Sequence, residues 1–350
     1  MGNRDAGNRI VAKDVTTDDT PEGSHDVLIV GAGPAGLSAG LAAQNAGLSY
    51  LVIERGCIAH TIYHYPTGLL FYSTPELIEL GDIPLIVREA KPTREEALRY
   101  YRRFVEVKGL KVHTYEEVTE ILGSDGDFTV RTHTDGAGAH AYRTRKIILS
   151  TGAFDQPKRI NVPGENLPKV THYFKEAHPY YDRDVLVVGG KSSAVETALT
   201  LFRSGARVTL SYRRAEFYGI KYWVLPDLEN RIQEGSIRAI MSSTVKEIRQ
   251  RDVVLQVADQ DADLVISNDF VFCMTGHEPD VAFLTDIGVE VAGPDRRPAH
   301  DQETFESNVP GVYVIGVITA GNIGNEVFIE NSRTHGPKVI EHITTRNRTL

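Results

Sequence analysis

Three glycines near the start of the chain, Gly31, Gly33 and Gly36, have the spacing of a dinucleotide-binding loop. The first glycine allows a tight turn, the second lets backbone N–H groups approach a pyrophosphate, and the third lets a helix pack against a strand. Apolar residues predict a strand over 25–30 before this loop and a helix over 37–46 after it. The N-terminus of that helix would then face the phosphates.

An acidic residue follows where a ribose contact is expected. A second strand is predicted over 50–53 and ends at Glu54, whose carboxylate can accept hydrogen bonds from the adenosine ribose hydroxyls. The order of strand, glycine turn, helix, strand and acid makes a chance glycine turn the weaker interpretation. The residues expected to bind a cofactor here are Gly31, Gly33, Pro34, Ala35, Gly36 and Glu54.

The same pattern recurs in the second half of the chain. A strand is predicted over 184–188, followed by a glycine turn, a helix through residue 202 and a strand over 207–210. Lys191 replaces the middle glycine, and its charge would either approach a pyrophosphate or point into solvent. The residues expected to bind a cofactor in this copy are Gly189, Gly190, Lys191, Ser192, Ser193 and Ala194.

Two arginines stand where the second copy would carry its acid. Tyr212 occupies the position that corresponds to Glu54, and Arg213 and Arg214 follow it. Guanidinium groups suit the 2′-phosphate of NADPH, whereas the carboxylate that favours NADH is missing. A solvated basic pair is the alternative, but we favour binding of NADPH.

Two nucleotide-binding units in one chain are explained if a flavin and a nicotinamide must stack for hydride transfer. The 350 residues suit two domains, and each copy has its own closing strand, over 146–150 and over 269–273. Proline and glycine in 156–169 predict a crossover between domains, and a second crossover is expected near 277–280.

We therefore predict an α/β fold of two Rossmann-like dinucleotide-binding domains in the glutathione-reductase-type arrangement. The expected parts are a flexible tail over 1–24, a discontinuous FAD-binding domain over 25–156 and 280–350, and an NAD(P)H-binding domain over 157–279.

The C-terminal part is expected to complete the FAD-binding domain. A strand over 311–315 is predicted to lead through an asparagine-rich turn into a helix over 326–331. The N-terminus of that helix could face the pyrimidine edge of the flavin and stabilise negative charge on reduced FAD. Further cofactor contacts are expected at Gly152, Gly276, Gly316 and Asn325.

The composition of the chain argues against several classes of function. A net charge of −9 argues against a nucleic-acid partner, and the lack of a long apolar run argues against a membrane span. Cys57 and Cys273 form no Cys-x-x-Cys and lie in no cluster of metal ligands along the sequence, so neither a disulfide scaffold nor a metal site is predicted. The N-terminal residues lack the apolar core of a secretory signal, so a cytoplasmic location is the default expectation. A homo-oligomer is also expected.

Several stretches resemble the thioredoxin-reductase-like flavoproteins, and more closely their bacillithiol-disulfide reductase branch. They are GAGPAG at 31–36, TIYHYP at 61–66, FYSTPELIELGDIP at 71–84, VVGGKSSAVE at 187–196 and AGNIGNEVFIENSRTHG at 320–336. The resemblance covers about residues 25–345. It implies an NADPH-dependent FAD oxidoreductase that reduces a low-molecular-weight disulfide such as bacillithiol disulfide.

One departure from that branch concerns its thiol chemistry. The resemblance places a redox cysteine between the proline and the last glycine of the first loop, where this chain has Ala35. Alanine forms no thiolate or mixed disulfide. Cys57 is expected near the adenosine end of FAD and Cys273 at a strand end, both in structural roles.

Other functions therefore stay open. A small redox protein such as ferredoxin, a quinone or oxygen would accept electrons without a cysteine, and a non-catalytic redox sensor is also compatible with Ala35. His64, His277 and His335 are candidate proton donors, although ordinary hydrogen-bonding roles are the stronger interpretation for each. No catalytic residue is assigned from the sequence.

Overall fold

The computed structural model describes residues 23–154, 156–324 and 326–347. These residues form two compact units. The first takes the chain up to Tyr63, Leu69–Gln156 and the residues from Glu278 onward, and the second takes His64–Gly68 and Pro157–His277. The expected tail falls mainly on residues 1–22, which lie outside the described residues, as does Asn325.

The first unit is built on a mixed sheet in the order β3-β2-β1-β6-β5-β4, with β19 paired to β6. Neighbours are parallel from β3 to β6 and for β19, whereas β4, β5 and the first half of β6 run antiparallel. The strands are β1 (Ser24–Val30), β2 (Tyr50–Glu54), β3 (Val112–Thr114), β4 (Glu116–Ser124), β5 (Asp127–Thr134), β6 (Gly138–Leu149) and β19 (Val312–Val314).

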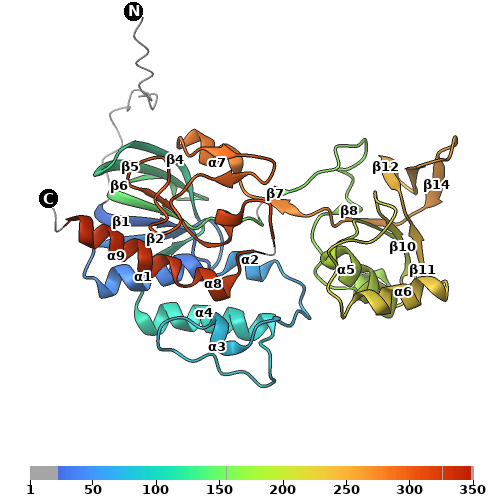
Figure 1. Ribbon diagram of the computed structural model, residues 1–350, viewed down its shortest axis with the longest axis horizontal. Helices are drawn as coiled ribbons and strands as arrows, with labels where there is room; N and C mark the ends of the chain where they lie inside the picture. Colours follow the sequence, from blue (N-terminus) through green and yellow to red (C-terminus); the bar gives the residue numbers. More distant parts are fainter. Residues whose placement is uncertain (1–22, 155, 325, 348–350) are drawn as a thin grey trace, which may run out of the picture. The chain divides into compact units, whose positions relative to one another are not determined.

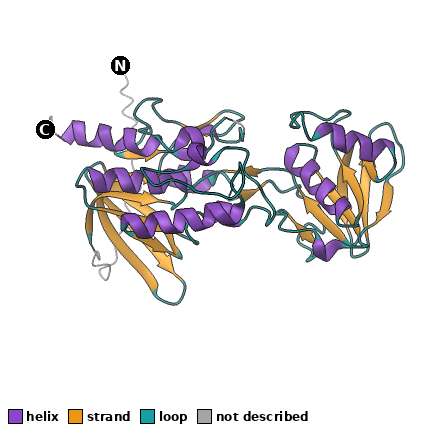
Figure 2. Cartoon of the chain, turned by 90° about the horizontal axis from the view of Figure 1, so that it is seen from below, coloured by secondary structure: helices purple, strands orange, loops and turns teal. Residues whose placement is uncertain are grey.

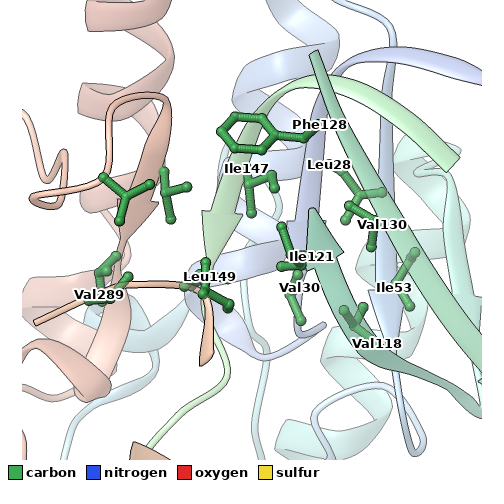
Figure 3. Packing of buried hydrophobic residues seen from close by; sticks show 14 of the residues in the cluster. Leu28, Val30, Ile53, Val118, Ile121, Phe128, Val130, Ile147, Leu149 and Val289 are labelled. Atoms are coloured by element: carbon green, nitrogen blue, oxygen red, sulfur yellow. The ribbon is translucent and has the colours of Figure 1, made fainter. Parts of the chain in front are cut away.

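The core of this unit lies between the parallel strands, the β4–β5 hairpin and the C-terminal segment. Figure 3 shows Leu28, Ile53 and Ile147 of the parallel strands near Phe128 and Val130 of β5. All five side chains are almost completely buried. Burying apolar surface in this way holds the carboxyl ends of β1, β2 and β6, where the first glycine loop starts, in fixed positions.

Small residues let two helices approach each other in the first unit. Helix α9 (His335–Asn347) lies beside α1 (Pro34–Asn45), as Figure 1 shows. A Cβ at Gly336 would lie 2.5 Å from the Cα of Ala39, so only glycine fits at this crossing. The other helices of the unit are α2 (His60–Tyr63), α3 (Pro75–Ile78), α4 (Arg94–Lys108), α7 (Val281–Asp286), α8 (Ile329–Ser332) and the 3₁₀ helix η2 (Gly316–Ala320).

The second unit has a parallel sheet in the order β11-β10-β9-β15-β8 and an antiparallel sheet of β12, β13 and β14. In both units helices accompany the strands (Figure 2). The elements are β8 (Val170–Thr171), η1 (His178–Tyr180), β9 (Asp184–Val188), α5 (Ser192–Arg203), β10 (Arg207–Ser211), α6 (Leu225–Gln233), β11 (Ile237–Ile240), β12 (Ser243–Ile248), β13 (Asp252–Val257), β14 (Leu264–Ser267) and β15 (Phe270–Cys273). Two short strand pairs complete the list of described elements: β7 (Gln156–Pro157) with β16 (His277–Glu278), and β17 (Val291–Ala292) with β18 (Arg297–Pro298).

The predicted α/β fold with two dinucleotide-binding-type sheets is confirmed. One element is misplaced, however, because the helix predicted over 326–331 is the single turn α8, and the long helix is α9. The Asn331 side chain accepts a hydrogen bond from the N-cap residue Phe328 and donates one to Glu326 O, so it marks the start of α8 at Ile329 and leaves Glu326 outside the helix. A helix N-terminus aimed at the flavin is therefore not expected there.

Candidate dinucleotide-binding sites

The first glycine loop joins β1 to α1 and has the shape that a pyrophosphate needs. Gly31 has φ +104°, and a Cβ there would lie 2.5 Å from the carbonyl oxygen of Ser150. A Cβ at Gly36 would overlap the carbonyl oxygen of Gly31. Beside Gly33, by contrast, a Cβ would meet no described atom within 4 Å. The loop is thus closed on the protein side and open at the N-terminus of α1, which suits an anion.

Pro34 and Ala35 begin α1. Gly33 is the N-cap with no side-chain cap, and Pro34 at the first turn has no N–H to satisfy. The first turn of α1 carries no acidic residue. The helix dipole and the neighbouring N–H groups therefore stay available to a phosphate.

Glu54, the residue expected to meet the ribose, holds the first glycine loop in place. Its Oε2 accepts a 2.8 Å hydrogen bond from Ala32 N, and its Oε1 accepts one of 2.8 Å from Gly56 N. Burial raises the pKa of the carboxyl group, and the two backbone N–H groups partly oppose this effect. Each oxygen keeps further acceptor capacity, so the side chain can fix the loop and still receive ribose hydroxyls.

Ser150, at the end of β6, is a contributor that the glycine spacing did not identify. Its Oγ lies 2.9 Å from the carbonyl oxygens of both Val30 and Gly31, and its hydroxyl hydrogen is directed toward them. The hydroxyl pins the start of the glycine loop to the closing strand. Gly152 follows two residues later, and a Cβ there would lie 3.9 Å from Thr61 Oγ1.

The C-terminal segment brings Gly316 and His335 to the same loop. A Cβ at Gly316 would lie 3.1 Å from Ala35 Cβ, so the two residues face each other. Gly316 N donates to His335 Nδ1 over 3.3 Å, and the His335 ring stacks on Phe305 at 4.1 Å between centroids. Burial, with Lys338 and His300 nearby, lowers the pKa of His335 to about 4, so the ring is neutral at pH 7.

The second glycine loop joins β9 to α5. A Cβ at Gly189 would overlap the carbonyl oxygen of Met274 and lie 3.0 Å from the Cβ of Ala194, which explains why alanine fits the third position. Lys191 is the N-cap of α5 and is exposed. Ser193 is also exposed, while Ser192 Oγ accepts a hydrogen bond from Lys221 N over 3.2 Å. An anion at this helix N-terminus would find Lys191 beside it.

Tyr212, at the position that corresponds to Glu54, packs against the second glycine loop. A Cβ at Gly190 would overlap the Tyr212 ring, which is buried and stacks on Phe217 at 5.8 Å with planes 7° apart. The tyrosine thus packs under the glycine loop. Arg213 and Arg214 follow it with exposed side chains, and the Arg214 guanidinium lies 5.4 Å from the centroid of Tyr218.

The remaining candidate residues, among them Cys57, contact residues other than the two glycine loops. Cys57 Sγ lies 3.7 Å from His60 Nδ1, and burial and Glu54 raise the pKa of its thiol. His64 and His277 both lie against Tyr173, at 5.8 Å and 5.0 Å between ring centroids. Gly276 accepts a hydrogen bond from Lys158 N.

Comparison with known proteins decides the family. The model of the pyridine nucleotide-disulphide oxidoreductase family matches residues 28–316. The chain belongs to this family. It is an NAD(P)H-dependent flavin oxidoreductase with FAD as its flavin, as the resemblance to thioredoxin-reductase-like proteins implied.

Individual relatives show which members of the family this chain is similar to. It is 44% identical to the bacilliredoxin reductase Bdr of Bacillus subtilis over 321 residues, and this alignment covers 91% of this chain and 97% of the relative. The structure of the bacillithiol disulfide reductase Bdr of Bacillus cereus aligns with a TM-score of 0.89 and 43% identity, over 92% of this chain and 99% of that one. A ferredoxin–NADP reductase of Ignicoccus hospitalis is 28% identical over 84% of this chain and 90% of its own.

These residues fit the cofactors that the family implies. FAD would supply the two-electron chemistry, and the chain would hold its pyrophosphate at the first loop. Within the part of the chain that the structure describes, none of the helices is both long and apolar enough to cross a lipid bilayer.

Proposed function

We propose that this chain transfers electrons from NADPH through FAD to a low-molecular-weight disulfide such as bacillithiol disulfide. The observation that carries the proposal is the pair of glycine loops in two units of a chain that is 44% identical to a bacilliredoxin reductase. In the balanced reaction, NADPH, one proton and a disulfide give NADP⁺ and two thiols.

The first unit is proposed to bind FAD and the second to bind NADPH. The open side of Gly33 and the carboxylate of Glu54 support the first assignment. Exposed Arg213 and Arg214, together with Lys191 at the N-cap of α5, support the second, because all three can meet phosphate groups.

His335 is proposed to position the FAD loop rather than to donate a proton. A ring with a pKa of about 4 is neutral at neutral pH, and its Nδ1 already accepts from Gly316 N. The role of this histidine is then to hold Gly316 against Ala35 at the start of α1.

A second candidate is the reduction of a non-thiol acceptor, namely a ferredoxin, a quinone or oxygen. Ala35 favours it, since this position carries no thiol, and the relative named ferredoxin–NADP reductase is consistent with it. The structure describes both cysteines of the chain as half-buried or buried free thiols with raised pKa values, so neither supplies a ready thiolate.

An acceptor screen tests the two candidates. The purified holoprotein is reduced with NADPH under anaerobic conditions, and reoxidation of its flavin is followed after mixing with bacillithiol disulfide, ferredoxin, a quinone or oxygen. Measurable turnover with the disulfide is expected, although it should be slow because position 35 carries no thiol. Turnover with only a ferredoxin or a quinone would overturn the disulfide assignment, and failure of NADPH to bleach the flavin would favour the non-catalytic sensor.

The expected cytoplasmic location and homo-oligomer stay predictions. Sedimentation of the FAD-loaded protein would measure the oligomeric state directly.

A further inference from the structure

A buried cluster of three metal-ligating side chains lies in the second unit, away from both glycine loops in sequence. Glu165, His172 and Cys273 bring one ligand atom each to within 4.8 Å of one another. Glu165 and Cys273 are almost fully buried, and the His172 side chain is nine-tenths buried. The cluster was missed in the sequence because its members come from three separate segments.

Backbone hydrogen bonds orient Glu165, whereas the ring nitrogens of His172 have no hydrogen-bond partner among the described residues. The Glu165 carboxylate accepts hydrogen bonds from Ile160 N and Asn161 N, at 2.9 Å and 2.8 Å, which fix its direction. Neither ring nitrogen of His172 makes a hydrogen bond with any residue that the structure describes. A buried ring with two unsatisfied nitrogens is costly, so a ligand at this place would relieve it.

The nitrogen and oxygen of the cluster have the spacing of two ligands of a tetrahedral zinc ion, and the sulfur lies within 4.8 Å of both. Zn–N and Zn–O bonds of about 2.1 Å at the tetrahedral angle would separate the nitrogen and oxygen by about 3.4 Å. The distance from His172 Nε2 to Glu165 Oε1 is 3.4 Å. A thiolate, an imidazole and a carboxylate are all common zinc ligands, and water can take the fourth position.

A simple ion pair between Glu165 and His172 explains the cluster less well. Such a pair would direct a ring N–H at the carboxylate, yet at 3.4 Å His172 Nε2 makes no hydrogen bond with Glu165.

We infer that Glu165, His172 and Cys273 form a binding site for Zn²⁺ or a similar thiophilic divalent cation. Binding replaces the S–H bond of Cys273 with a metal–sulfur bond and releases that proton to solvent, while the neutral imidazole and the carboxylate bind without a proton change. Cys273 pairs in register with Val188, which precedes the second glycine loop. The ion would therefore brace the strand ends that carry this loop.

Zinc content and X-ray absorption of the full-length, FAD-loaded protein test the inference without reference to its activity. After equilibration with zinc and passage over a chelating resin, one zinc per chain is expected, with one sulfur ligand at about 2.3 Å. Cys273→Ser should lose both the zinc and the sulfur signal, and His172→Gln should lose the zinc. Cys57→Ser, which removes the other cysteine, should keep both.

Three results would overturn the site. They are zinc below one-tenth per chain in the unmodified protein, zinc bound without a sulfur ligand, and zinc retained equally by Cys273→Ser, which would indicate adventitious surface binding. If Cys273→Ser fails to retain FAD, the spectrum of the unmodified protein and the zinc content of His172→Gln still decide the question.

Discussion

Ala35 and Gly316 face each other at the start of α1, with 3.1 Å between the Ala35 Cβ and the place that a Gly316 Cβ would occupy. Because Gly316 has no side chain, a residue larger than alanine at position 35 would meet only its backbone on this side. A sulfur there would lie at the N-terminus of a 12-residue helix, where the dipole lowers the pKa of a thiol.

We expect Ala35→Cys to raise turnover of bacillithiol disulfide about tenfold or more, which corresponds to a barrier lower by about 1.4 kcal/mol. The physical reason is that a thiolate would attack the disulfide, whereas the unmodified chain offers none at this position. Steady-state oxidation of NADPH with the disulfide measures the effect. Ala35→Ser is the matched control because it adds an atom of similar placement without a thiol. Equal turnover by all three proteins, unaffected by Cys57→Ser, would show that a thiolate here is dispensable.

Replacing Arg213 and Arg214 together by alanine should raise the KM for NADPH roughly 10- to 100-fold and change the KM for NADH little. Both side chains are exposed and follow β10, and a charge-assisted hydrogen bond contributes about 1.5 to 3 kcal/mol. Arg238→Ala is a suitable control, since this exposed arginine lies on the adjacent strand β11. If the unmodified protein uses NADH and NADPH equally well, the assignment to the 2′-phosphate is wrong.

Glu54→Ala should weaken both the glycine loop and the retention of FAD. The substitution leaves the N–H groups of Ala32 and Gly56 without their acceptor, at about 1 to 3 kcal/mol each where they stay buried. Flavin absorbance per protein after gel filtration measures retention. Glu54→Gln, which keeps one acceptor, should be intermediate, and Glu117→Gln, an exposed carboxylate on β4, should match the unmodified protein. Full retention by Glu54→Ala would contradict the proposed ribose contact.

Local patterns predicted the parts of the molecule whose geometry is set within a few residues. The glycine loops, β9 and the helices after them follow from steric rules that act between sequence neighbours. The contacts of Ser150 and the cluster around His172 join distant segments, so spacing along the chain did not reveal them. His335 was a candidate from the sequence, but its contact with Gly316 N also joins distant segments and was not foreseen. The misplaced helix near α8 has a local origin instead, because the Asn331 side chain accepts a hydrogen bond from the N-cap residue Phe328 and so marks a helix start at Ile329.

The last prediction concerns the pH dependence of stability and the neutral ring of His335. Its pKa falls from 6.5 to about 4 on folding, so the unfolded chain binds a proton in this range while the folded protein does not. The histidine therefore contributes stability above pH 6.5 that is lost as the pH falls toward about 4. Because the ring is only partly buried, we expect a loss of about 1 to 2 kcal/mol rather than the full effect of the shift.

Urea unfolding of the FAD-loaded protein at several pH values between these limits measures this contribution. His335→Gln should lower stability at pH 7, since Gly316 N loses its acceptor, but should also flatten the decline with acid. His178→Gln, which changes an exposed histidine of the second unit, should decline with acid as steeply as the unmodified protein. An acid profile of His335→Gln that runs parallel to the unmodified one would mean that folding does not lower the pKa of the ring, and the assigned pKa of about 4 would then have to be abandoned.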